Sequence, residues 1–124
     1  MIAAASSYMK PGASIVNITS INTRMPPSDA VAYAASKSAL ETITQGCAKS
    51  LGPKGIRVNA VSPGIVERPH APRPQSVLDQ VTDDSALGRL AETSVFAATV
   101  RFLASDGARA ITGETLTVSA GYRL

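Results

Sequence analysis

The stretch Ile56-Arg57-Val58-Asn59-Ala60-Val61 organises the chain. It is rich in β-branched and small apolar residues, and strong breakers bound it, Gly52-Pro53-Lys54-Gly55 before it and Ser62-Pro63-Gly64 after it. Such a run predicts one strand. The segment from Ala30 to Leu51 contains no proline or internal breaker pair and is predicted to be a long helix ending at the first of these turns.

Two more strands flank this unit. Ser14 to Thr19 is dominated by β-branched residues with little alternation, which is typical of a strand buried on both faces. Thr115-Leu116-Thr117-Val118 predicts a third strand, and residues 77–81 and 92–104 predict further helices. Strands separated by helices pair in parallel through crossovers, so we expect an α/β fold in a single domain over residues 1–124.

The loop between the first strand and the long helix, residues 22–27, ends at Ser28 and Asp29. Serine and aspartate side chains accept hydrogen bonds from the free N–H groups of a helix start. We therefore expect one of these two residues to cap the helix.

Composition and charge exclude several classes of function. The chain of 124 residues has a net charge of +3, but its 12 lysines and arginines are scattered, which argues against nucleic-acid binding. Cys47 is the single cysteine and is expected to be a buried structural thiol. No metal-ligand cluster, membrane span or signal peptide is evident, so we expect a soluble cytoplasmic protein.

Three polar side chains are candidates for catalysis. Ser20 follows the first strand, and Tyr33 and Lys37 are four residues apart near the start of the long helix, where such spacing places both on one face. An ammonium close to a phenol stabilises the phenolate, which brings proton exchange toward neutral pH. A serine hydroxyl can donate a hydrogen bond to an oxygen that gains charge. Ligands of parallel sheets bind beyond the carboxyl ends of the strands, where these residues and Pro63-Gly64 should meet.

The sequence resembles the C-terminal half of a classical short-chain dehydrogenase/reductase, and is most similar to 3-oxoacyl-carrier-protein reductases. The motif Tyr33-Ala34-Ala35-Ser36-Lys37 and Ser20, thirteen residues earlier, carry the likeness. So do the stretch 56–64 and the segments 88–90, 102–106 and 111–114. The resemblance implies part of a Rossmann-like doubly wound parallel sheet, about three strands with flanking helices, without the N-terminal dinucleotide-binding half.

The resemblance also implies roles for individual residues. Tyr33 would exchange a proton with a carbonyl or secondary alcohol, and Ser20 would orient and polarise the carbonyl. Lys37 would assist Tyr33 and bind the nicotinamide ribose, and Tyr33 would also contact the cofactor. The backbone of Pro63-Gly64-Ile65 would flank the nicotinamide. Together these roles predict an NAD(P)H-dependent oxidoreductase acting on a small molecule.

The sequence departs from the family pattern in two places. None of the nine glycines forms the Gly-x-Gly turn that lets a backbone approach a pyrophosphate. Arg68 stands where family members commonly carry threonine; it would either contact a cofactor phosphate or acidic substrate, or lie in an exposed loop. His70, the only histidine, is more simply explained as a surface-loop residue than as a substrate contact.

A non-catalytic function is the alternative. The first half of the long helix carries mostly small side chains, which let another backbone or a cofactor approach closely. The chain would then be a remnant that retains inherited active-site residues and packs or oligomerises through this helix. In either case we expect a homo-oligomer formed through residues 30–51, together with self-association at the exposed edge of the strand 14–19.

Overall fold

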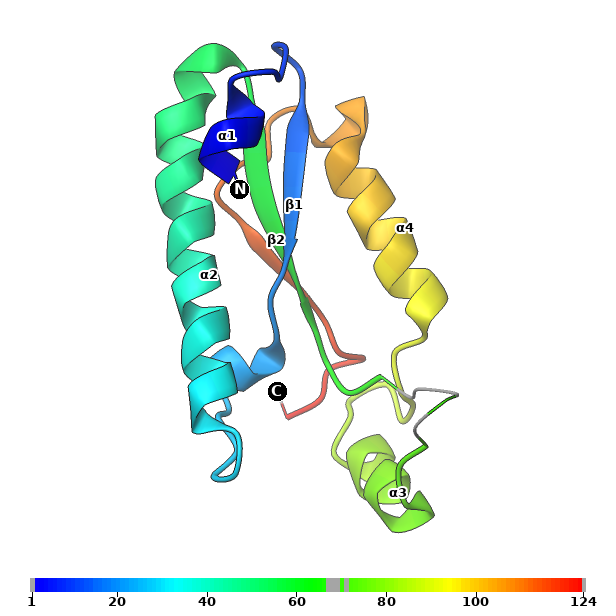
Figure 1. Cartoon of the computed structure of the whole chain (residues 1–124). Coiled ribbons are helices and arrows are strands. Elements are labelled where there is room, and N and C mark those ends of the chain that lie inside the picture. The colour runs from blue at the N-terminus through cyan, green and yellow to red at the C-terminus, as the bar shows by residue number, and fades with distance from the viewer. Residues whose placement is uncertain (1, 67–69, 71, 124) are drawn as a thin grey trace.

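The computed structural model describes residues 2–66, 70 and 72–123, and a parallel sheet organises them. The sheet has three strands in the order β1-β2-β3, with bounds Ser14–Ile18, Arg57–Pro63 and Thr115–Val118. Figure 1 shows α2 along one face of the sheet and α4 along the other. The predicted fold class, a partial doubly wound parallel sheet of three strands with flanking helices, is confirmed.

The predicted helices form close to their expected bounds. The structure has four α-helices and three 3-10 turns among the described residues: α1 Ile2–Ser6, α2 Val31–Leu51, α3 Gln75–Asp83, α4 Thr93–Ala104, η1 Ile21–Thr23, η2 Gly52–Lys54 and η3 Asp106–Ala108. Gly55 follows η2 with a φ of 71°, a left-handed conformation that glycine adopts without strain. Across these ranges no helix combines the length and apolar character needed to cross a membrane.

The predicted cap of α2 is wrong. The N-cap residue is Ala30, which has no side-chain oxygen, and the helix start has no side-chain cap hydrogen bond. The cause is the preceding turn, in which the Ala30 N–H donates to the carbonyl of Pro27 at 3.2 Å. This turn brings Ala30, rather than Ser28 or Asp29, to the position where the helix begins.

Two expectations about the strands also need correction. β1 is not buried on both faces: Ile18 is 46% exposed and the other four residues are half-buried. The outer edge of β1 pairs with no strand among the described residues, so less of the chain covers it. β2 continues through Pro63 rather than ending at Val61, because Pro63 pairs with Val118 and the next N–H, that of Gly64, donates to the Val118 carbonyl.

The core lies on both faces of β2, whose five central residues are buried. Val58 packs with buried residues of and after α2, and Cys47 lies half-buried against this cluster. Val61 packs on the opposite side with Leu103 of α4 and Ala108. Successive strand residues point to opposite faces, so one strand supplies both layers of the core.

One buried polar side chain ties β2 to the segment before β3. Asn59 is fully buried, its Nδ2 donates to the carbonyl of Ile111 at 2.9 Å, and its Oδ1 accepts the N–H of Glu114 at 3.1 Å. Both groups of the side-chain amide are therefore paired without water. This arrangement fixes the entry of β3 into the sheet.

Replacing Asn59 with alanine should strongly destabilise the chain. The Asn59→Ala variant removes the side-chain partners of two part-buried backbone groups, the carbonyl of Ile111 and the N–H of Glu114, each at a cost of about 1–2 kcal/mol. We expect the free energy of unfolding to fall by about 2–4 kcal/mol in urea titrations followed by circular dichroism. Ser50→Ala, at an exposed position of α2, should change it by less than about 0.5 kcal/mol. Equal effects of the two substitutions would contradict this role of Asn59.

Candidate active site

The carboxyl ends of β1 and β2 are held together just before Ser20. The N–H of Thr19 donates to the carbonyl of Val61 at 2.8 Å, and the Thr19 hydroxyl donates to the same oxygen at 3.3 Å. Thr19 is almost fully buried. These two bonds continue the pairing of the strands beyond β1 and bring Ser20 to the edge where β2 ends.

Ser20 is oriented by the turn that follows it. It is the N-cap of η1, and its Oγ accepts the N–H of Asn22 at 3.2 Å. A hydroxyl that accepts one hydrogen bond still has its own hydrogen to donate. The serine is 9% exposed, so its position is set by the surrounding structure while its donor remains available.

Tyr33 and Lys37 lie on the first turns of α2 and face the same strand end. The Lys37 ammonium donates to the carbonyl of Ile18 at 2.8 Å and lies 5.6 Å from the centre of the Tyr33 ring. Residues four apart on a helix share a face, which is why the sequence spacing produces this pair. The side chain of Tyr33 is 47% exposed, so its ring can reach a bound molecule.

Two further hydrogen bonds hold α2 against this end of the sheet. Asn17 of β1 donates to the hydroxyl of the buried Thr44 at 2.9 Å, and Thr23 of η1 donates to the Glu41 carboxylate at 3.1 Å. The helix is therefore attached both to the strand and to the turn after it. The relative position of Ser20 and Tyr33 follows from these attachments.

A cavity of about 320 Å³ brings the predicted residues together, lined by Ser20, Ile21, Asn22, Tyr33, Gly64, Ile65, Val66 and Arg73. Four of the six predicted site residues are in this lining. The two that are not lie close by: Lys37 is beside the Tyr33 ring, and Pro63 is the last residue of β2. The cavity thus combines two hydroxyl-bearing side chains with the backbone beyond a strand end.

Gly64 allows the ends of β2 and β3 to approach closely at this cavity. A Cβ atom at this position would lie 2.8 Å from both the Cα and the Cβ of Ser119, a distance that real side chains do not adopt. Only glycine fits without moving β3. Ile65 follows it in the lining, and the Ile65 N–H has no hydrogen-bond partner among the described residues.

The cavity contains an arginine, Arg73, that the sequence pattern did not point to. Arg68 was considered as a phosphate or substrate contact, and it lies outside the described residues. His70 is exposed in a turn and is absent from the cavity lining, whereas Arg73 is half-buried and lines the cavity. The signal that could have drawn attention to Arg73 is its position between Pro72 and Pro74, which restrict the local backbone.

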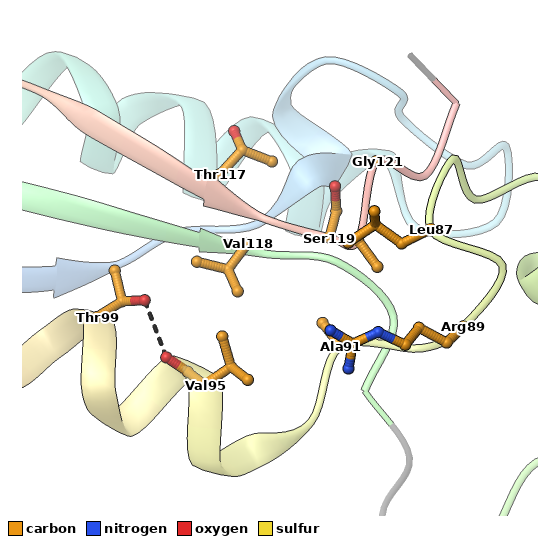
Figure 2. A pocket seen from close by; sticks show the side chains of 10 residues that line it. Leu87, Arg89, Ala91, Val95, Thr99, Thr117, Val118, Ser119 and Gly121 are labelled. Atoms are coloured by element: carbon orange, nitrogen blue, oxygen red, sulfur yellow. Dashed lines mark hydrogen bonds between the residues drawn. The ribbon is translucent and has the colours of Figure 1, made fainter.

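A second cavity, of about 430 Å³, lies between β3 and α4 (Figure 2). The figure shows Val95 and Thr99 of α4 on one side and Val118 on the other, with the Thr99 hydroxyl bonded to the Val95 carbonyl at 2.9 Å. This cavity shares no lining residue with the first, and Arg89 is its one charged residue among those described. The described part of the chain also contains no cluster of three or more side chains suited to a metal ion.

Comparison with known proteins places these features in a family. A family model described as enoyl-(acyl carrier protein) reductase matches residues 1–123. General stress protein 39 of Bacillus subtilis is 37% identical over 116 residues, covering 92% of this chain and 41% of the relative. A 3-oxoacyl-acyl-carrier-protein reductase of Pseudomonas aeruginosa is 40% identical over 113 residues, covering 86% of this chain and 44% of that protein.

Solved structures have the same fold over nearly the whole chain. A short-chain dehydrogenase/reductase from Serratia marcescens superposes with a TM-score of 0.89 at 38% identity, covering 97% of this chain and 49% of that one. A blue fluorescent protein from a metagenomic library, in complex with NADPH, gives 0.90 at 35% identity, with 99% and 50% covered. The chain spans about half the length of the relatives it matches. It belongs to the short-chain dehydrogenase/reductase family.

Proposed function

We propose that this chain carries the catalytic residues of an NAD(P)H-dependent oxidoreductase that exchanges hydride between a nicotinamide and a carbonyl or secondary alcohol. One observation carries the proposal: Ser20 and Tyr33 line the same cavity, and the Lys37 ammonium lies 5.6 Å from the centre of the Tyr33 ring. Besides a hydride, carbonyl reduction needs a proton donor, and a hydrogen-bond donor to the oxygen and a nearby cation stabilise the negative charge that develops.

Each of the three side chains has a separate task in this proposal. In reduction, the Ser20 hydroxyl donates a hydrogen bond to the substrate carbonyl oxygen, and the Tyr33 hydroxyl transfers its proton to that oxygen as negative charge develops. The nearby Lys37 ammonium stabilises the phenolate that remains. In the oxidation of an alcohol, the Tyr33 phenolate takes the proton back.

The residues of the cavity fit the nicotinamide end of a dinucleotide. Lys37 has three N–H donors, of which the carbonyl of Ile18 takes one, so donors remain for ribose hydroxyls. The N–H of Ile65, which has no hydrogen-bond partner among the described residues, can bind the carboxamide. A nicotinamide cofactor would supply the hydride. The solved relative in complex with NADPH supports this choice, whereas the chain contains no Gly-x-Gly turn for a pyrophosphate.

The cofactor proposal predicts saturable binding of NADPH or NADH to the 124-residue chain, followed by nicotinamide fluorescence. Lys37→Ala should weaken this binding by about tenfold, because a charge-assisted hydrogen bond contributes about 1.5–3 kcal/mol. Lys49→Ala removes an exposed lysine of the same helix and should leave binding unchanged. An absence of binding at millimolar cofactor would show that this chain does not take the cofactor alone and would favour the non-catalytic alternative.

The assignment of Tyr33 as the proton donor predicts a specific loss of turnover. Tyr33→Phe keeps the ring and deletes the hydroxyl, so we expect the rate of carbonyl reduction to fall by about 10²- to 10⁴-fold while cofactor binding stays within about twofold. Tyr8→Phe, at an exposed position near the N-terminus, is the matched control. Undiminished turnover by Tyr33→Phe in a chain that reduces carbonyls would rule out this role.

We further propose that the chain forms a homo-oligomer through the outer face of α2. Ala32, Ala35 and Ala39 are exposed along this helix, and Ile43, one turn beyond Ala39, is 48% exposed. Small side chains allow a second helix to approach closely, and the exposed isoleucine supplies apolar area to bury. The edge of β1, which pairs with no strand in the described ranges, gives a second surface for association.

This proposal predicts a concentration-dependent dimer in sedimentation velocity. Ala39→Arg places a long charged side chain in the centre of the face and should shift the chain to monomer. Gln80→Arg adds the same charge at an exposed position of α3 and should leave the distribution unchanged. A wild-type chain that remains monomeric at high concentration would contradict the proposal.

A further inference from the structure

The one charged residue in the described lining of the candidate active site is Arg73. Its Nη1 donates to the carbonyl of Val66 at 2.8 Å, and this is its one hydrogen bond within the part of the chain that the structure describes. A guanidinium has five N–H donors in a planar fork. Most of these donors therefore have no described partner on the wall of the cavity that Tyr33 also lines.

The charge of Arg73 is not balanced by a described neighbour. Both ion pairs of the described residues lie elsewhere, between Arg89 and Glu92 and between Arg123 and Asp84. The ammonium of Lys37, beside the Tyr33 ring, has the same sign as Arg73 and cannot neutralise it. A half-buried cation is stabilised when a bound group neutralises it, so the cavity favours a negatively charged occupant.

The backbone around Arg73 is constrained before any ligand binds. Proline precedes and follows it, and Pro74, with a φ of −53° and a ψ of 140°, is the N-cap of α3. A residue that precedes proline is restricted to extended conformations. The bond from Arg73 to Val66 adds a second restraint across the loop. Less freedom is lost on binding when a side chain is held in this way.

We propose that Arg73 binds an anionic group, a carboxylate or a phosphate, of the molecule that reacts at Tyr33. The substrate class that follows is a small carbonyl compound or alcohol carrying one negative charge, since a cavity of about 320 Å³ admits a short molecule. Arginine suits this task because its fork matches the two oxygens of a carboxylate or phosphate. The inference rests on the proposed function and adds the chemical class of the substrate to it.

The test compares two probes, 3-oxobutanoate and its methyl ester, which share the same carbonyl group and differ in charge and by one methyl group. Each is titrated into the isotope-labelled 124-residue chain while the backbone amide resonances of Ser20 and Ile65 are followed by NMR. We expect Arg73→Gln to raise the dissociation constant of 3-oxobutanoate by about tenfold or more and to leave that of the ester unchanged. Arg73→Lys, which keeps the charge but not the fork, should lie between the two.

Two controls accompany the titrations. Arg109→Gln removes an exposed arginine that is not in the cavity lining and should change neither dissociation constant. Circular dichroism of every variant checks that the fold is retained. Raising the salt concentration should weaken binding of 3-oxobutanoate and not of the ester, because only the former depends on a charge pair.

A third probe, reduced nicotinamide mononucleotide, separates the two sources of an anion. If Arg73→Gln weakens binding of the mononucleotide and not that of 3-oxobutanoate, Arg73 binds a cofactor phosphate and the proposed substrate class is overturned. The anion site itself is overturned if binding of neither anion depends on Arg73. It is also overturned if the wild-type chain binds neither anion below about 10 mM, a concentration at which binding has little energetic significance.

The same data distinguish a failure of this inference from a failure of the proposed function. If Ser20→Ala weakens binding of the ester but Arg73→Gln does not change binding of 3-oxobutanoate, the proposed reaction at Ser20 and Tyr33 stands and the anion site is overturned. If binding of 3-oxobutanoate requires Arg73 but binding of the ester is unchanged in Ser20→Ala, the anion site stands and the proposed reaction at Ser20 and Tyr33 is overturned.

Discussion

The structure depends on the parallel pairing of β1 with β2. This pairing buries β2 between two helical layers, and it continues through the two hydrogen bonds from Thr19 to the Val61 carbonyl. Ser20 and Gly64 therefore end on the same edge of the sheet, although 43 residues separate them in the sequence. A parallel sheet places all its strand ends of one kind together, and this geometry makes that edge a binding edge.

The long helix α2 adds the reactive side chains to that edge. Its first turns carry Tyr33 and Lys37, while the middle of the helix is held to β1 through Thr44. The bond from Lys37 to the carbonyl of Ile18 makes the lysine both a structural contact and the cation of the site. Because one helix carries the reactive pair and contacts the core, the position of the pair is coupled to packing of the fold.

The charges around the cavity favour one class of substrate in our proposal. Lys37 lies beside the tyrosine and Arg73 lies in the lining, and neither forms an ion pair with a described carboxylate. The hydroxyls of Ser20 and Tyr33 can bind any carbonyl oxygen, so they do not select among carbonyl compounds. In our proposal the substrate is selected by Arg73, which lies between two prolines just before α3 and binds the negative charge of the substrate.

The order and type of the main elements, their parallel pairing, and the spacing that brings Ser20 and Tyr33 to one cavity could all be predicted from the sequence. These features follow from local patterns: breaker residues around β2, β-branched runs, and the four-residue helical period. Local patterns did not predict that Ile18 of the edge strand is exposed or that Arg73 lines the cavity; both depend on the packing of the folded chain. The physical reason is that burial and loop placement depend on which distant segments pack together, and no local pattern records those contacts.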